Sequence, residues 1–158
     1  MPIITLTTHI SAPIERVFDL SLSVDLHVAS MGHTGESAVG EITTGLLKLG
    51  DAVTWRARHL GVRQRLTSKI TALDRPLYFR DSMVRGAFSR FDHDHYFERL
   101  GAGTIMRDRF NYTSPLGLLG HAADWLFLKR YLTTLLMKRN TTIRRIAETD
   151  RWRQFLHD

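Results

Sequence analysis

Six runs of strand-forming residues follow one another along the middle of the chain, and this succession limits the possible folds more than any other feature. The runs are rich in β-branched and aromatic residues, and turn residues separate them roughly every ten positions. The predicted strands cover residues 37–45, 51–60, 62–73, 77–85, 89–99 and 103–113. Because the connections are short, consecutive strands are predicted to pair as an antiparallel meander.

The N-terminal region predicts one further strand and two short helices. Residues 3–10 alternate in the manner of a strand. Ser11-Ala12-Pro13 then marks a helix start, with serine as the candidate N-cap and proline in the first turn. The apolar residues that would face the core from these helices are Val17, Phe18, Leu20, Leu22 and Leu26.

One long helix is predicted after the meander. Ser114 and Pro115 supply a cap and a first turn, and apolar residues then recur at three- and four-residue spacing up to Glu148. Such a helix would span the diameter of a domain of this size. Gly117 and Gly120, near its start, predict either a delayed helix start or a flexible lip at the mouth of a cavity.

Together these elements predict an α+β protein in which a curved antiparallel sheet grips one long helix. A curved antiparallel sheet of about seven strands needs cover on its inner face, and only the C-terminal helix is long enough to provide it. The two short helices after the first strand would close one end. The 158 residues are sufficient for one domain, residues 1–158, and no internal repeat suggests a second.

Composition and charge exclude several classes of function. The chain has no cysteine, which excludes disulfides, thiolate catalysis and zinc–cysteine sites. Neither a signal peptide nor an apolar run of the ~20 residues needed to span a membrane is evident, so a cytoplasmic protein without stable membrane insertion is expected. The net charge of +6 favours anionic partners in general. No nucleic acid partner is expected, because the charge is dispersed and no nucleic-acid-binding motif is present.

Histidine and aspartate residues alternate with large apolar residues along the last three predicted strands. Side chains two positions apart on a strand share a face. His93 and His95 therefore share one face of their strand, and Asp108 and Asp81 occupy the same alternation phase on the neighbouring strands. The apolar residues in that phase are Phe79, Met83, Phe91, Phe97, Met106, Phe110 and Tyr112.

Four interpretations of His93, His95, Asp81 and Asp108 stay open. They can form a structural hydrogen-bond network inside the sheet, or they can anchor the polar end of a mostly apolar ligand. A histidine with Asp108 can act as a general acid–base pair. Two histidines and a carboxylate can also bind a divalent metal. We expect no metal and no cofactor, because the spacing is not otherwise diagnostic and no ligand from a third strand is evident.

Five segments that together extend over nearly the whole chain are similar to a known family. They are Ser11-Ala12-Pro13 with Val17-Phe18, Pro76-Leu77-Tyr78-Phe79-Arg80-Asp81, Gly86-Ala87-Phe88, Phe91-Asp92-His93-Asp94-His95-Tyr96-Phe97, and Arg107-Asp108-Arg109-Phe110-Asn111-Tyr112 leading into Pro115-Leu116-Gly117. The chain resembles the START/Bet v 1-like (SRPBCC) superfamily, and within it the small bacterial ligand-binding or cyclase/dehydrase-like proteins, also called cell-division-inhibitor-like. The resemblance implies the helix-grip fold and transfers no assigned catalytic residue.

The expected function is the binding of a small hydrophobic or amphipathic ligand, such as a lipid, polyketide or isoprenoid, between the sheet and the C-terminal helix. The same side chains would also serve as plain core in any sheet protein. The candidate lining residues are Trp55, Phe79, Asp81, Met83, Phe88, Phe91, His93, His95, Phe97, Met106, Asp108, Phe110 and Tyr112.

Two other classes of function are kept. One is a cyclase or dehydratase with His93 or His95 as the base and Asp108 orienting it. The other is a regulatory interaction domain that acts through basic residues such as Arg144 and Arg145, a surface that would also suit transient membrane contact. The oligomeric state is left open. The basic residues of the second hairpin are predicted to form an outer, solvated face, and they are Arg56, Arg58, Arg63 and Arg65.

Overall fold

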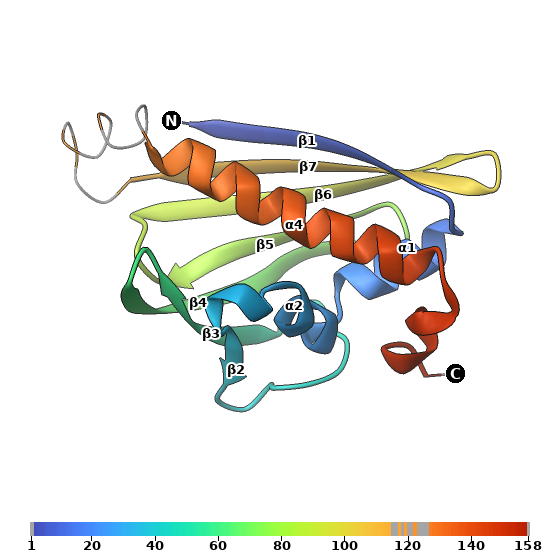
Figure 1. Ribbon diagram of the computed structural model, residues 1–158, viewed down its shortest axis with the longest axis horizontal. Helices are drawn as coiled ribbons and strands as arrows, with labels where there is room; N and C mark the ends of the chain where they lie inside the picture. The colour runs from blue at the N-terminus through green and yellow to red at the C-terminus, as the bar shows by residue number, and fades with distance from the viewer. Residues whose placement is uncertain (1, 115–116, 118, 120–121, 123–126, 158) are drawn as a thin grey trace.

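A seven-stranded antiparallel sheet curves around the long helix α4, Lys129–Ala147, as Figure 1 shows. The computed structural model describes residues 2–114, 117, 119, 122 and 127–157. The strands are β1 (Ile3–Ile10), β2 (Ser37–Val39), β3 (Ala52–His59), β4 (Val62–Asp74), β5 (Tyr78–Arg85), β6 (Arg90–Leu100) and β7 (Gly103–Thr113). The other helices are α1 (Ile14–Ser21), α2 (Val24–Ser30) and the 3-10 helices η1 (Gly32–Thr34) and η3 (Asp150–Gln154).

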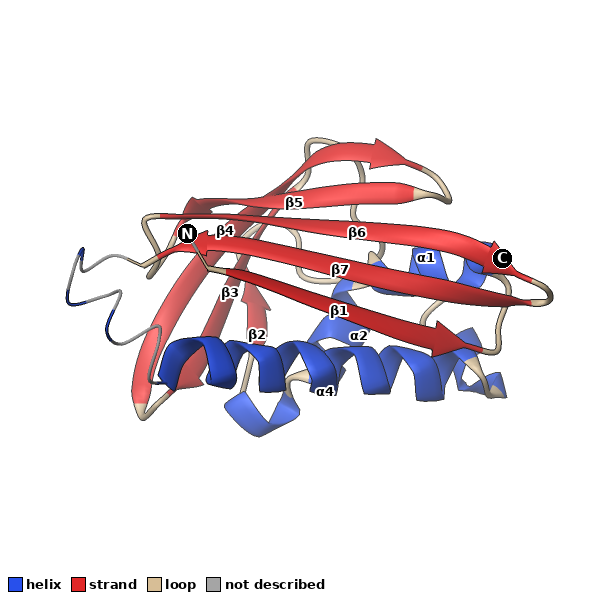
Figure 2. Cartoon of the chain, turned by 90° about the horizontal axis from the view of Figure 1, so that it is seen from above, coloured by secondary structure: helices blue, strands red, loops and turns tan. Residues whose placement is uncertain are grey.

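The strand order is β1-β7-β6-β5-β4-β3-β2, so the meander from β2 to β7 is extended by β1 at its far edge. All neighbouring strands are antiparallel. The register between β4 and β5 shifts at Thr67/Ser68 and again at Ile70/Ala72, and irregularities of this kind increase the local bend and twist of a sheet. Helices α1, α2 and α4 all lie on one side of the sheet (Figure 2). The predicted helix-grip fold is confirmed.

Two boundaries differ from the prediction. The strand predicted over 37–45 ends at Val39, because Gly40 and Gly45 both adopt positive φ angles that do not continue a β ladder. Ser11 is not the cap of α1, since Pro13 occupies that position and the Ser11 amide donates instead to Glu148 Oε1 at 2.9 Å. The predicted start of the long helix at Pro115 falls on a residue outside the described ones, whereas its predicted end near Glu148 agrees with Ala147.

The core differs between the two ends of the sheet. At the closed end, the side chains of α1, the end of α4 and the sheet are almost completely buried against one another. They include Val17, Phe18, Phe79, Phe97, Met106, Ile143 and Ile146. At the open end, Ile4, Phe91, Phe110 and Tyr112 are buried, but the apolar side chains packed against them are only partly buried. These are Leu6, Leu66, Met83, Phe88, Leu128, Leu132 and Leu136.

Helix α4 is tied to both ends. Its C-terminal part packs on α1, and Arg16 lies 4.5 Å above the ring of Trp152 in η3. Near its N-terminal end, the Tyr131 hydroxyl lies 2.9 Å from Nδ1 of His59, at the end of β3. Within the described residues, none of the helices combines the length and apolar character needed to cross a membrane.

Candidate functional site

Three neighbouring strands bring His93, His95, Asp81 and Asp108 together on the inner face of the sheet. Strand β6 carries both histidines, and its register places His93 opposite Asp81 of β5 and His95 opposite Asp108 of β7. The two histidine side chains and Asp108 are 7 % exposed or less, whereas the Asp81 side chain is 21 % exposed. The inward phase read from the sequence is therefore the phase that the structure adopts.

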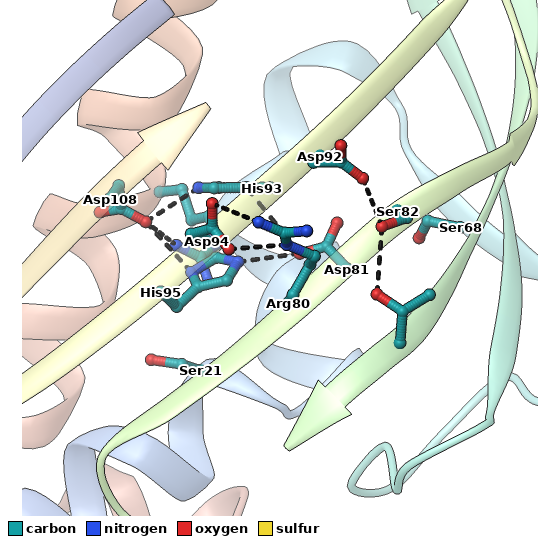
Figure 3. Close-up of polar contacts among 12 residues, drawn as sticks. Ser21, Ser68, Arg80, Asp81, Ser82, Asp92, His93, Asp94, His95 and Asp108 are labelled. Carbon is teal, nitrogen blue, oxygen red and sulfur yellow. Dashed lines mark hydrogen bonds and ion pairs between the residues drawn. The ribbon is translucent and has the colours of Figure 1, made fainter. Parts of the chain in front are cut away.

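Each histidine lies between the two carboxylates (Figure 3). His95 Nε2 is 2.8 Å from Asp81 Oδ2, and its Nδ1 is 3.1 Å from Asp108 Oδ1. His93 Nε2 is 3.0 Å from the same Asp108 oxygen, and its Nδ1 is 3.9 Å from Asp81 Oδ2. The two rings lie 3.8 Å apart between centroids. The His95 Nδ1 contact lacks hydrogen-bond alignment, so this buried nitrogen has no hydrogen-bond partner.

Helix α4 holds Asp108 from the side opposite the histidines. Asn140 Nδ2 donates to Asp108 Oδ2 at 2.6 Å, and Arg139 Nη1 lies 3.5 Å from Asp108 Oδ1. Arg139 also donates to Asn140 Oδ1 at 3.1 Å, and Asn140 donates to Thr8 Oγ1 of β1 at 3.3 Å. Both α4 residues are buried. The network thus joins four strands of the sheet to the helix.

Arg139 and Asn140 were not predicted as site residues from the sequence. A signal existed for Asn140, which sits at helical spacing between Leu136 and Ile143 and so occupies the inward stripe of α4. An amide in that stripe must find a buried partner. No sequence pattern indicates that the partner is Asp108, because the two residues are 32 positions apart.

The electrostatics of the group favour ionised carboxylates and a neutral His93. Burial raises the pKa of Asp108, but its interactions with His93 and His95 outweigh burial and hold the pKa well below its usual range. Burial also raises the pKa of Asp81, but its interactions with His95 and His93 outweigh burial and lower the pKa below its ordinary value. Burial and the neighbouring His95 lower the pKa of His93.

The apolar candidates divide between the two ends of the core. Phe79 stacks on His95 with centroids 4.1 Å apart, and it belongs to the closed end together with Phe97 and Met106. Phe110 meets His93 edge-on at 5.2 Å. With Phe110, the open end brings together Met83, Phe88, Phe91 and Tyr112. The histidine–aspartate group lies at the junction of the two ends.

Trp55 lies in a different part of the core from His93 and His95. It lies in a separate small cluster with Val24 and Val53, where its ring packs on His27 at 4.2 Å between centroids. The indole nitrogen donates to Ser68 Oγ at 3.4 Å. Trp55 thus holds α2 against the sheet.

Two hollows of the surface have linings that do not include His93 or His95. One, of about 180 Å³, lies between β1 and α4 and is lined by residues that include Leu6, Asn140 and Arg144. The other, of about 390 Å³, lies beside Arg56, Arg63, Gln64 and Arg65. The arginines of this hairpin are exposed, as predicted, and they face one another across the strands in the pairs Arg56–Arg65 and Arg58–Arg63.

Comparison with known proteins gives both a family and structural relatives. A family model described as polyketide cyclase / dehydrase and lipid transport matches residues 10–138. A search of curated proteins gave no match. Among solved structures, the chain is similar to TTHA0849 from Thermus thermophilus, with 20 % identity, a TM-score of 0.70 and coverage of 90 % of this chain and 97 % of that one.

Two further structures show the same architecture. CV1439 from Chromobacterium violaceum has 13 % identity and a TM-score of 0.70, over 94 % of this chain and 98 % of that one. The major latex-like protein 151 from Panax ginseng has 15 % identity and a TM-score of 0.65, over 94 % and 98 %. At these identities the likeness establishes the fold alone. Since the family model covers most of the sequence, the chain belongs to the polyketide cyclase/dehydrase and lipid transport family.

Proposed function

We propose that the protein binds a small hydrophobic or amphipathic molecule at the open end, between the inner face of the sheet and the first half of α4. One observation carries the proposal. Apolar side chains that face the interior from both layers, among them Met83, Phe88, Leu132 and Leu136, remain partly exposed and outnumber the buried ones there, whereas buried side chains predominate at the closed end. Protein interiors are normally close-packed, so the loosely covered end is the one that an apolar molecule could complete. The family's description, which includes lipid transport, agrees with this use.

Apolar contacts would supply most of the affinity, at roughly 0.8 kcal/mol for each ligand CH₂ that is buried. The hollows described above do not lie between Met83 and Leu136, so the ligand would enter by displacing side chains that are already partly exposed. Methionine and leucine side chains adapt readily to such a guest. His93 and Asp81, at the inner limit of the open end, would orient the ligand's polar group by hydrogen bonding.

A matched pair of variants tests this proposal. Leu136→Phe adds bulk on the inward side of α4, and Met137→Phe makes the same kind of change one residue later, where the side chain is 55 % exposed. The measurement is displacement of a fluorescent fatty acid from untagged protein. We expect Leu136→Phe to bind the probe at least ~10-fold more weakly, because overfilling a packed site costs on the order of 1–3 kcal/mol. Met137→Phe should bind like the wild type. Equal weakening in both variants, or no binding by the wild type, would contradict the proposal.

A second candidate is a cyclase or dehydratase, and the hydrogen bond between His93 and Asp108 favours it. A carboxylate that orients an imidazole is the usual arrangement of a general base. In this reading, His93→Gln abolishes turnover of an identified substrate while its binding changes only a few-fold. A parallel loss of binding and turnover would instead assign the histidine to ligand anchoring.

A further inference from the structure

Asp81, His93 and His95 each present one potential ligand atom, and these three atoms lie within 4.8 Å of one another. The nitrogens that face Asp81 Oδ2 are His95 Nε2 at 2.8 Å and His93 Nδ1 at 3.9 Å. When two donor atoms each lie about 2.1 Å from one metal ion, they are ~3 Å apart if the angle at the metal is a right angle and ~3.4 Å apart if it is tetrahedral. The two separations from Asp81 Oδ2 bracket these values. The shorter one is a hydrogen bond, so an ion would replace the proton between His95 Nε2 and Asp81, and His93 Nδ1 would have to move closer.

The outer nitrogens of both rings already face a carboxylate. His93 Nε2 and His95 Nδ1 lie 3.0 and 3.1 Å from the same oxygen of Asp108. Metal-binding histidines almost always direct their second ring nitrogen at a carboxylate or carbonyl, which fixes the tautomer and leaves the other lone pair free for the metal. Asp108 is in turn held by Asn140 at 2.6 Å. The outer support of a metal site is therefore present, built from β7 and α4.

The charge of the group also favours a cation. Asp81 and Asp108 bring two negative charges into the inner face, and the guanidinium of Arg139 is the one fixed cation that contacts them among the described residues. Buried carboxylates normally carry enough cationic partners to balance them. In addition, His95 Nδ1 is buried without an aligned hydrogen-bond partner.

Access to the three ligand atoms is one-sided. The side chains of His93, His95 and Asp108 are almost completely buried, whereas that of Asp81 is 21 % exposed. An ion would enter past Asp81, on the side of the partly buried Met83. Three protein ligands leave coordination positions open for water or for an oxygen of a bound molecule.

We propose that Asp81, His93 and His95 bind one divalent transition-metal ion, with Asp108 as the outer carboxylate that orients both imidazoles. Two histidines and one carboxylate form a donor set that suits zinc and iron(II). The site shares Asp81 and His93 with the proposed anchor for the ligand's polar group, and it can be tested with no such molecule present.

The test uses untagged protein treated with a chelator and then dialysed. Zn²⁺ is titrated calorimetrically, and Co²⁺ is followed by its visible absorption, which reports the ligand geometry. We expect one equivalent of each ion to bind. Asp81→Asn should weaken Zn²⁺ binding at least ~100-fold, since it removes one of three ligands. Asp108→Asn should weaken it ~10- to 100-fold with the stoichiometry kept.

His9→Gln is the matched control, because His9 is an exposed histidine on β1 of the same sheet. Its Zn²⁺ affinity should equal that of the wild type. Near-UV circular dichroism verifies that each variant is folded. If His93→Gln or His95→Gln fails to fold, Asp81→Asn still tests the proposal. Asp81 is the most exposed of the three ligands, so its substitution is the least disruptive to folding. The proposal is overturned if the folded wild type takes up no stoichiometric Zn²⁺, or if Asp81→Asn binds it as tightly as the wild type.

Discussion

Each face of strands β5, β6 and β7 carries a polar network around a fully buried carboxylate, and the two networks differ in composition and in the exposure of the cations. On the outer face, Asp94 is fully buried, and it accepts hydrogen bonds from the Tyr78 hydroxyl at 2.6 Å and from Arg80 Nε at 2.7 Å. Arg109 lies 3.8 Å away. One carboxylate thus meets two guanidinium groups and a phenol. On the inner face, one step along β6, Asp81 and Asp108 share two imidazoles and a single guanidinium.

This difference indicates that burial alone does not identify a functional site. Asp94 is satisfied by its partners, and nothing about it requires a ligand. The inner group has one guanidinium for two carboxylates, and it lies beside apolar side chains that are only partly buried. The ligand and metal proposals rest on these two features together: two carboxylates with one guanidinium, and neighbouring apolar side chains that are incompletely buried. Variants of the two faces can test it.

The largest effect is expected from Asp108→Asn on the inner face. The substitution removes the charge that pairs with Arg139 and that faces both histidines. Removing one partner of a buried pair costs about 3–5 kcal/mol, so the free energy of unfolding in urea should fall by about that amount. A loss below about 1 kcal/mol would mean that the inner network contributes little to stability.

A smaller loss is expected from Asp94→Asn on the outer face. Arg80 and Arg109, whose side chains are 38 % and 45 % exposed, can turn to solvent when the charge is removed. We expect a loss of about 2 kcal/mol in the same urea experiment, with probe and Zn²⁺ binding unchanged. A change in either binding would show that the two faces are not separate.

Tyr78→Phe should change the alkaline stability. Burial and the hydrogen bond to Asp94 raise the pKa of Tyr78 to about 12, from an ordinary value of 10.0. Above pH 10 the unfolded chain releases this proton while the folded chain keeps it, so the contribution of Tyr78 is complete below pH 10 and is lost as the pH rises to about 12. The variant should lose about 1 kcal/mol at neutral pH and show a shallower decline between pH 10 and 12. An unchanged decline would contradict the assignment, and thermal unfolding at several pH values measures it.

The smallest effect is expected from Ser82→Ala, also on the outer face. Ser82 Oγ donates to Asp92 Oδ1 at 2.6 Å, but Asp92 also pairs with Arg90 and stays partly exposed. The loss should be about 0.5 kcal/mol, near the limit of urea denaturation. A loss as large as that of Asp94→Asn would mean that the outer network extends along β5.

The sequence was sufficient to predict the sheet, its meander order and the inward phase of His93, His95, Asp81 and Asp108. The inward face of β6 is clear because Phe91 and Phe97, in the same alternation phase, flank the two histidines, and Phe110 marks the phase of Asp108 on β7 in the same way. The pairing of particular atoms was not predictable. It depends on the register of β5 on β6 and on the turn of α4 that brings Asn140 to Asp108.

The extent of the lining could not be predicted either. Phe97 and Met106 share the phase of His95 and Asp108, yet they lie in the closed end because α1 packs on them. Phe18 of α1 meets Phe97 at 5.1 Å between ring centroids. Which part of an inner face is covered depends on where the helices rest, and periodicity along a strand carries no information on that.

In our interpretation, the inner face of the sheet binds ligands, whereas the polar network of the outer face is structural. Native mass spectrometry of untagged protein as purified, repeated after organic extraction, separates the two roles in the wild type, Leu136→Phe and Asp94→Asn. We predict an adduct on the wild type and on Asp94→Asn that extraction removes, and a reduced adduct on Leu136→Phe. An adduct that persists unchanged in Leu136→Phe but is lost in Asp94→Asn would contradict this division between the faces.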